Sequence, residues 1–281
     1  MSEQINNIKT SAGFIKNKFP KNFKPVTGIV SESNFNIFGE FKVLSEIDFS
    51  DIPGFNVSGK GSGKVLFARS KGIKSSDVLI YKGRLHYYEE ASMRDIGHTV
   101  YVMKYLGVKK LISVDESGHL NPRYNCGEIA LIYDHINLTG DNPLIGRNED
   151  ELGLRFPDMS NAYNKELHEK IYKILQERQI RINDAVILGI SGPQSETEAE
   201  ARFYRDIGAD VVGYSMVSEN IASVHCGIKF AGIGIITREL VADVMLEDQR
   251  SEIQKNKDKK NSLKKAEKIM EKLIADIIDR I

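Results

Sequence analysis

Short apolar runs alternate with amphipathic stretches along most of the chain. The apolar runs predict buried strands at 26–30, 64–68, 77–81, 110–114, 129–133, 185–190, 211–213 and 230–236. Apolar positions three and four residues apart predict helices over 93–106, 162–178 and 196–207, with a further helix through Ile221. Strands that alternate with helices indicate an α/β fold: a single domain with a mixed, largely parallel central sheet flanked by helices.

The two ends of the chain are more polar than its middle. We expect a polar lead-in over 1–24, the α/β domain over 25–254 and a charged amphipathic helix, packed on the domain, over 255–281. Lysines are dense over 255–265, as in a nucleic-acid patch, but acidic residues are interspersed. An apolar stripe in the tail favours a docked helix; it consists of Leu263, Ile269, Met270, Leu273, Ile277 and Ile281. The glycine-rich stretch 59–63 predicts a mobile loop.

Composition narrows the class of protein. Lys plus Arg and Asp plus Glu both number 39, so no global field favours nucleic acid or an anionic membrane. The beginning of the chain lacks the basic and apolar regions of a signal peptide, and no apolar run is long enough to span a bilayer. Two cysteines, Cys126 and Cys226, are too few for a disulfide scaffold. These features predict a cytoplasmic protein.

Several short motifs rich in glycine, polar and charged residues follow one another along the chain. They are GRLHYYE at 83–89, LNP at 120–122, DHIN at 134–137, NPLIG at 142–146, RFPDMS at 155–160, SGPQSET at 191–197, GADVVGYS at 208–215 and HCG at 225–227. They occur in the order found in the trimeric purine nucleoside phosphorylases, and so many ordered matches are not expected by chance. The likeness covers roughly residues 24–252. The chain therefore resembles this family and is identified as a divergent member.

This resemblance implies a nucleoside phosphorylase-like fold and a specific reaction. The reaction is phosphorolysis of a 6-oxopurine ribonucleoside or deoxyribonucleoside to the free base and the sugar 1-phosphate. Inorganic phosphate is then the co-substrate, and neither a cofactor nor a metal site is expected. The resemblance also implies a homotrimer in which Phe156 reaches a neighbouring subunit's site; without it, Phe156 would be read as an ordinary core residue.

Arg84 and His86 are the first candidates for binding phosphate. They lie two residues apart at the end of a predicted strand, so both side chains can point to one side. A guanidinium fork and an imidazole N–H suit a phosphate dianion, and Glu89 could orient the imidazole. The residues alone favour a structural ion-pair network with Glu89 and Glu90; the resemblance favours the phosphate role.

The resemblance assigns further residues to the site. Ser215 corresponds to a serine that contacts phosphate, and Tyr88 to a tyrosine that contacts the ribose. Tyr214 lies where a methionine usually lines the sugar and base. Glu196 corresponds to the carboxylate that accepts hydrogen bonds from the purine edge, although a glutamate at a helix start is otherwise a dipole-favoured surface residue.

The chain departs from the family pattern around the phosphate. The family's G-S-G turn reads Ser-Glu-Ser at 31–33, which places Glu32 near the phosphate-binding serine, with Ser33 as a possible substitute one position later. Glu116 replaces an alanine whose backbone N–H contacts phosphate, and it can keep that contact if its side chain turns away. Lys60 replaces the histidine of the glycine-rich loop and would restore positive charge.

The base end also differs. Arg238 follows Thr237, where 6-oxopurine enzymes carry Asn and 6-aminopurine enzymes carry Asp. Because arginine only donates hydrogen bonds, it suits a 6-oxo group or N7 and not a 6-amino group. It could also fold back onto Glu196 or Glu239. We assign catalysis to His86, Glu196 and Arg238.

Two alternatives stay open beside the phosphorylase. The first is a nucleoside hydrolase on the same scaffold, in which Glu32 or Glu116 orients water where phosphate binds in the family. The second is a non-catalytic purine or nucleoside binder. Fold alone does not choose among these three, since function depends on the site.

Overall fold

The computed structural model describes residues 2–57, 63–89 and 91–281. Its strands are β1 (Thr27–Ser31), β2 (Phe41–Asp48), β3 (Gly63–Ser70), β4 (Asp77–Gly83), β5 (Lys110–His119), β6 (Ile129–Asn137), β7 (Asp184–Gly189), β8 (Val211–Gly213) and β9 (Lys229–Glu239). Its helices are α1 (Glu3–Lys16), η1 (Phe49–Asp51), α2 (Met93–Tyr105), α3 (Lys165–Glu177), α4 (Glu198–Asp206), α5 (Met216–His225), α6 (Ala242–Glu247) and α7 (Glu252–Arg280). The α/β fold and every strand expected from an apolar run are therefore confirmed.

The strands form one nine-stranded sheet in the order β2-β3-β4-β1-β5-β8-β7-β6-β9, and β9 also pairs with β5. Five of the pairings are parallel and four are antiparallel, so the sheet is mixed as expected. Because β9 also pairs with β5, five strands form a closed ring: β5, β8, β7, β6 and β9. The other four strands, β1 to β4, continue the sheet from β5. Strand β5 belongs to both parts.

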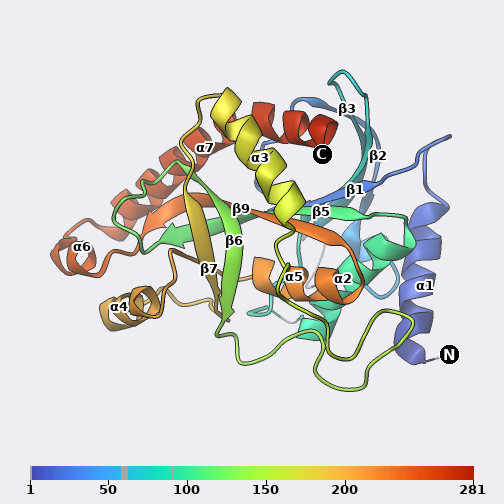
Figure 1. The fold of residues 1–281 in the computed structure, drawn as a ribbon, viewed down its shortest axis with the longest axis horizontal. Helices are drawn as coiled ribbons and strands as arrows, with labels where there is room; N and C mark the ends of the chain where they lie inside the picture. Colours follow the sequence, from blue (N-terminus) through green and yellow to red (C-terminus); the bar gives the residue numbers. More distant parts are fainter. Residues whose placement is uncertain (1, 58–62, 90) are drawn as a thin grey trace.

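Helices cover both faces of the sheet (Figure 1). Helices α3 and α7 pack on one face, where the apolar side chains of α7 meet those of the strands. Helices α1, α2 and α5 pack on the other face. Within the region expected to be a polar lead-in, α1 buries Ile5, Ile8 and Ile15, and α7 begins at Glu252, three residues before the boundary expected for the tail helix.

Local signals define the ends of the helices near the site. Ser92 and Asp95 form a capping box at the start of α2, and Thr197 and Glu200 form another at the start of α4. Helix α4 ends before Gly208, whose φ of +102° is the left-handed conformation that terminates helices and favours glycine. The start and the end of α4 are thus both set by local sequence, and this helix lies within the segment 191–215.

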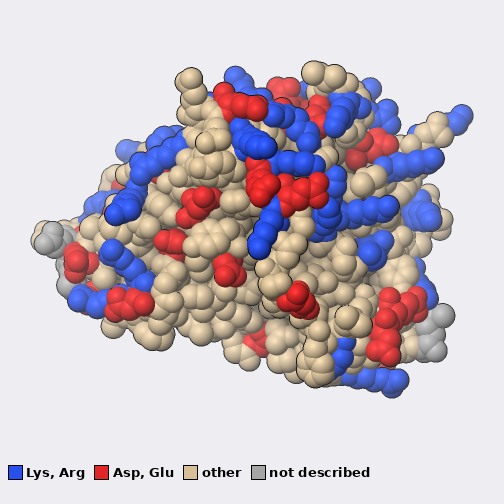
Figure 2. Space-filling view, viewed as in Figure 1, with Lys and Arg blue, Asp and Glu red and all other residues tan. Residues whose placement is uncertain are grey.

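Charged side chains of both signs are intermixed over the face that carries α3 and α7 (Figure 2). This distribution agrees with the equal numbers of acidic and basic residues. On this face, the lysines of the tail helix do not form a purely positive surface. Across the described ranges, no helix combines the length and apolarity needed to cross a membrane.

Candidate active site

Three parallel strands bring one group of charged side chains together. Strand β1 lies between β4 and β5, and all three run in the same direction. Glu32 follows β1, Arg84 follows β4, and Asp115 lies on β5 one residue beyond the pairing of Val114 with β1. The carboxyl ends of parallel strands are the usual place for a site in such sheets, because several loops and strand ends converge there.

Arg84 is the centre of this group. Its side chain is buried, and Nη2 donates to the backbone carbonyl of Val114 at 2.9 Å. Three carboxylates face the rest of the guanidinium: Asp115 at 2.8 Å from Nη1, Glu32 at 3.3 Å from Nε and Glu219 at 3.6 Å from Nε. Among the described residues, Nε and Nη1 nevertheless make no hydrogen bond of normal alignment. Arg84 can therefore still direct donors at an oxyanion.

His86 lies beside this cluster and connects it to α5. Its Nε2 is 3.4 Å from Glu32 Oε2, and its Nδ1 is 3.2 Å from the hydroxyl of Ser215. Ser215 is buried at the start of α5. Glu89, which we expected to orient the imidazole, is exposed, and Glu32 and Ser215 are the groups found at the two ring nitrogens.

The charges in this cluster shift the pKa values of its members. Burial opposes the charge of Glu32, but Arg84 and His86 outweigh it and lower the pKa of Glu32 to about 2. Burial, with Glu32 and Glu219 nearby, raises the pKa of Asp115 to about 7 despite Arg84. Burial alone would lower the pKa of His86, but Glu32 raises it above its ordinary value. A fixed anion next to the imidazole thus favours the imidazolium.

Glu219 is a member of the cluster that the sequence analysis missed. It is buried on α5, where the Ser113 hydroxyl donates to it at 2.6 Å. Its position one helical turn after Ser215 is the signal that could have found it, since residues four apart share a helix face.

A second polar group lies at the opposite end of the site. Arg238 donates from Nη1 to Glu196 Oε2 at 2.9 Å and from Nη2 to the Tyr214 hydroxyl at 3.1 Å. The guanidinium also lies 5.5 Å from the centre of the Tyr214 ring. The Tyr214 hydroxyl is 3.4 Å from Glu196 Oε1. A donor-only side chain and a buried carboxylate thus stand side by side.

Tyr88 joins the two ends. Its ring stacks on His86 at 4.7 Å between centres and meets Tyr214 edge-on at 5.8 Å. Gly192 packs against both tyrosines with φ +63°, and an added Cβ would lie 3.0 Å from the Tyr214 ring. The glycine of the SGPQSET motif therefore permits this close packing.

The Glu116 side chain turns away from Arg84. Its carboxylate accepts a hydrogen bond from Thr237 at 2.8 Å and lies 2.6 Å from Lys259 Nζ on α7. The Glu116 backbone N–H is directed at Asp115 Oδ1, 2.9 Å away. The charged tail helix thus contributes Lys259 to the edge of the site, a contact that the sequence analysis missed.

Two expected residues lie apart from the cluster, and a third is not among the described residues. Ser33 is exposed, and no hydrogen bond among the described residues joins it to Arg84 or His86. Phe156 is 85% exposed in the connection between β6 and α3. Lys60 falls outside the described residues.

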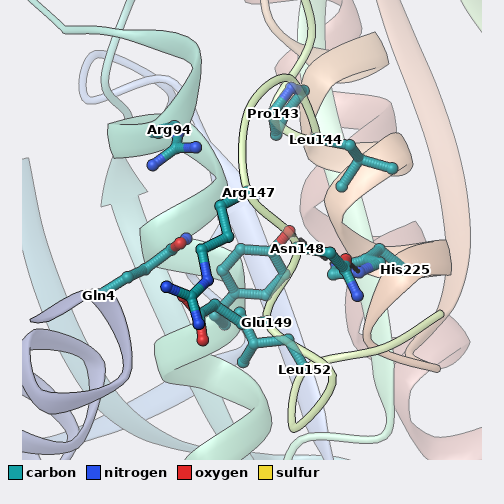
Figure 3. A pocket seen from close by; sticks show the side chains of 10 residues that line it. Gln4, Arg94, Pro143, Leu144, Arg147, Asn148, Glu149, Leu152 and His225 are labelled. Carbon is teal, nitrogen blue, oxygen red and sulfur yellow. Dashed lines mark hydrogen bonds between the residues drawn. The ribbon is translucent and has the colours of Figure 1, made fainter. Parts of the chain in front are cut away.

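A separate small hollow lies between α1, α2, α5 and the connection before α3 (Figure 3). Gln4, Arg94 and Arg147 line it, and Asn148 Oδ1 lies 3.1 Å from His225 Nε2. Its volume of about 10 Å³ is room for a single water molecule and excludes a nucleoside.

Comparisons with known proteins agree with this geometry. A family model described as "Phosphorylase superfamily" matches residues 27–279. Purine nucleoside phosphorylase 1 of Bacillus subtilis is 39% identical over 233 residues, which cover 82% of this chain and 84% of the relative. The purine nucleoside phosphorylase of Bos taurus is 35% identical over 82% of this chain and 81% of the relative.

Solved structures give the same result. The Schistosoma mansoni purine nucleoside phosphorylase in complex with inosine superimposes with a TM-score of 0.86 at 28% identity, covering 99% of this chain and 97% of that one. The complex of the Schistosoma mansoni protein with adenosine also gives a TM-score of 0.86. The likeness extends over nearly the whole chain.

Proposed function

The chain belongs to the purine nucleoside phosphorylases, a family of pentosyltransferases in the phosphorylase superfamily, and from this premise we propose how its site works. Its reaction is phosphorolysis of a 6-oxopurine ribonucleoside or deoxyribonucleoside. A phosphate oxygen forms a bond to C1′ of the sugar, the C1′–N9 bond breaks, and the electron pair leaves with the purine. The products are the free base and the sugar 1-phosphate.

One continuous path of contacts carries this proposal. It runs from Arg84 through Glu32 to His86, which also meets Ser215. From His86 it continues through Tyr88 and Tyr214 to the Glu196–Arg238 pair. The order matches a nucleoside bound beside phosphate: an anion end, an aromatic middle that suits a sugar, and a donor–acceptor pair for a base.

At the anion end, Arg84, His86 and Ser215 supply the donors. Arg84 and imidazolium His86 stabilise phosphate oxygens by charge-assisted hydrogen bonds, and the Ser215 hydroxyl adds a neutral one. Lys60, Ser33 and the Glu116 backbone are also expected from the sequence, but Ser33 is exposed and the Glu116 N–H is directed at Asp115 Oδ1. Because Arg84, His86 and Ser215 are already placed by the sheet and α5, little reorganisation of these three is needed in the transition state.

At the base end, Glu196 and Arg238 divide the purine edge between them. Glu196 accepts from N1–H, and from the 2-amino group of guanine. Arg238 donates to O6 or N7, where negative charge develops as the base leaves. A 6-aminopurine would present a donor to a donor, so this pair favours the 6-oxo class.

We propose that the active assembly is a homotrimer in the cytoplasm. The connection between β6 and α3 exposes Ile145, Leu154 and Phe156. A hollow of about 380 Å³ lies beside Phe156. Exposed apolar groups of this kind mark protein contact sites. Both cysteines are free thiols, which suits a reducing compartment.

The test is product analysis with guanosine and inorganic phosphate. Phosphorus NMR should show inorganic phosphate converted to ribose 1-phosphate as guanine appears. His86→Ala should raise the phosphate KM at least about 10-fold, because a charge-assisted hydrogen bond to a charged group contributes about 1.5–3 kcal/mol. The nucleoside KM should change less. Binding of guanosine without any product would instead identify a non-catalytic binder.

A further inference from the structure

A carboxylate of the chain itself lies on the two groups proposed to bind phosphate. Glu32 Oε1 is 3.3 Å from Arg84 Nε, and Oε2 is 3.4 Å from His86 Nε2. One carboxylate thereby spans both cationic groups, as two oxygens of a phosphate would. Because Glu32 directly follows β1, the sheet fixes its backbone at this point.

Of the carboxylates near Arg84, Glu32 is the one able to meet a sugar. Its side chain is 17% exposed, against 4% for Asp115 and 3% for Glu219. Glu116 is held elsewhere by Thr237 and Lys259. From Glu32, the stacked rings of His86 and Tyr88 lead toward the proposed ribose position.

A phosphate dianion meets an unfavourable balance of charge at this site. Arg84 already faces three carboxylates within 3.6 Å. Phosphate must displace Glu32 or bind beside it, and like charges a few ångströms apart repel one another in a partly buried site. Water carries no charge and does not meet this barrier.

We propose that this chain also hydrolyses purine nucleosides, with Glu32 as a resident anion beside C1′; the inference rests on the nucleoside site proposed above. The C1′–N9 bond breaks and its electron pair leaves with the purine, while the Glu32 carboxylate stabilises positive charge at C1′. The oxygen of a water molecule forms the new bond to C1′. This water loses a proton to solvent, and the purine takes up a proton from solvent. The products are the base and the free sugar.

The experiment compares base release from guanosine in phosphate-free buffer and in saturating phosphate. The proteins are the parent, Glu32→Gln and a matched control, Glu40→Gln, which alters an exposed carboxylate of the same β1–β2 connection. Proton NMR identifies the sugar product. In Glu32→Gln, phosphate-free release should fall about 100-fold, as expected when one group that stabilises charge in the transition state is removed. Glu40→Gln should match the parent.

Base release that depends on phosphate should not fall in the Glu32→Gln variant. At a pH low enough to keep His86 protonated in the variant, Glu32→Gln should retain it, with a lower phosphate KM, because the competing charge is gone. Equal loss of both activities would make Glu32 a structural residue and overturn the proposal. Glu32→Asp, which keeps the charge, guards against a folding defect and should retain part of the phosphate-free rate.

The parent alone separates this inference from the proposed function. Release that requires phosphate overturns hydrolysis and leaves phosphorolysis standing. Release that does not require phosphate and yields free ribose supports hydrolysis. An absence of release in both buffers overturns the two together.

Discussion

Arg238 donates through Nη1 to the Glu196 carboxylate at 2.9 Å, so the two side chains proposed to read the purine also hold each other. The Glu196 side chain is 1% exposed and that of Arg238 is 20% exposed. Glu196 is thus buried with its charge, and Arg238 is its only ion-pair partner among the described residues. This pair links the binding of the base to the stability of the fold.

Replacing Arg238 should therefore affect both properties. Arg238→Met leaves a buried carboxylate without its partner and should lower the free energy of unfolding by about 3–5 kcal/mol, measured by urea denaturation. The KM for guanosine should rise while the phosphate KM stays unchanged. The double variant Arg238→Met/Glu196→Gln should recover part of the stability and none of the guanosine affinity. Full stability in Arg238→Met would contradict the coupling.

The pKa of His86 should report on Glu32. Because the Glu32 anion raises that pKa, Glu32→Gln should lower it, and the His86 imidazolium should lose its proton at a lower pH. An NMR titration of the ring signals measures this shift. The other histidines serve as internal controls, since none of them contacts Glu32 in the described ion pairs. An unchanged His86 curve would show that the two side chains are not coupled in solution.

Asp115 should make stability fall as the pH rises from about 4 to about 7. Burial, with Glu32 and Glu219, raises its pKa to about 7 in the folded protein, whereas an aspartate titrates near about 4 in an unfolded chain. Between these values the folded state binds a proton that the unfolded state lacks, so stability decreases as pH rises. Asp115→Asn does not ionise, and its Tm relative to the parent should be higher at pH 8 than at pH 5.

The exposed Asp243 provides the control for this measurement. Asp243→Asn should leave the Tm difference the same at both pH values, because its side chain is 87% exposed. A difference for Asp115→Asn that is constant, or that favours the parent at pH 8, would contradict the assigned direction of the shift.

Phe156 tests the proposed trimer. Because it buries little within its own chain, Phe156→Ala should leave the melting of the isolated subunit unchanged. If it completes a neighbour's site, the nucleoside KM should rise about 10-fold, as expected for removal of an apolar contact of about 1.4 kcal/mol. Phe203→Ala on α4, also exposed, is the matched control. Sedimentation should give three times the 31.6 kDa chain mass.

The fold could largely be predicted from the pattern of apolar residues. The strand at 211–213 agrees with β8 residue for residue, because a short buried run between turn signals has few other interpretations. The sequence did not predict strand β2, because only Phe41 and Ile47 are buried in it. The five residues between them are exposed or half-buried, so β2 lacks the regular alternation of apolar and polar residues that indicates a strand. Strand β2 forms because it pairs with β3 at the edge of the sheet, and the periodicity of a sequence does not reveal such a pairing.

The site was harder to predict than the fold. Sequence analysis named Arg84, His86 and Ser215, and the structure brings them together. The directions of the acidic side chains could not be predicted, because their partners are distant in sequence. Glu116 turns toward Lys259 on the last helix, and Glu32 turns toward Arg84 on another strand. Long-range partners of this kind leave no trace in local spacing.

The ring closed by β5 and β9 has a consequence for solubility. Since β9 returns to β5, every strand in that part of the sheet has a neighbour on both sides, whereas β2 is the one strand among the described residues that pairs on one side alone. Open edges can template aggregation. Strand β2 carries exposed Lys42 and Glu46 and an irregularity between Val43 and Ser45, features that discourage pairing with a second chain. One end of the sheet is thus protected by closure, and the other by charge and irregular geometry.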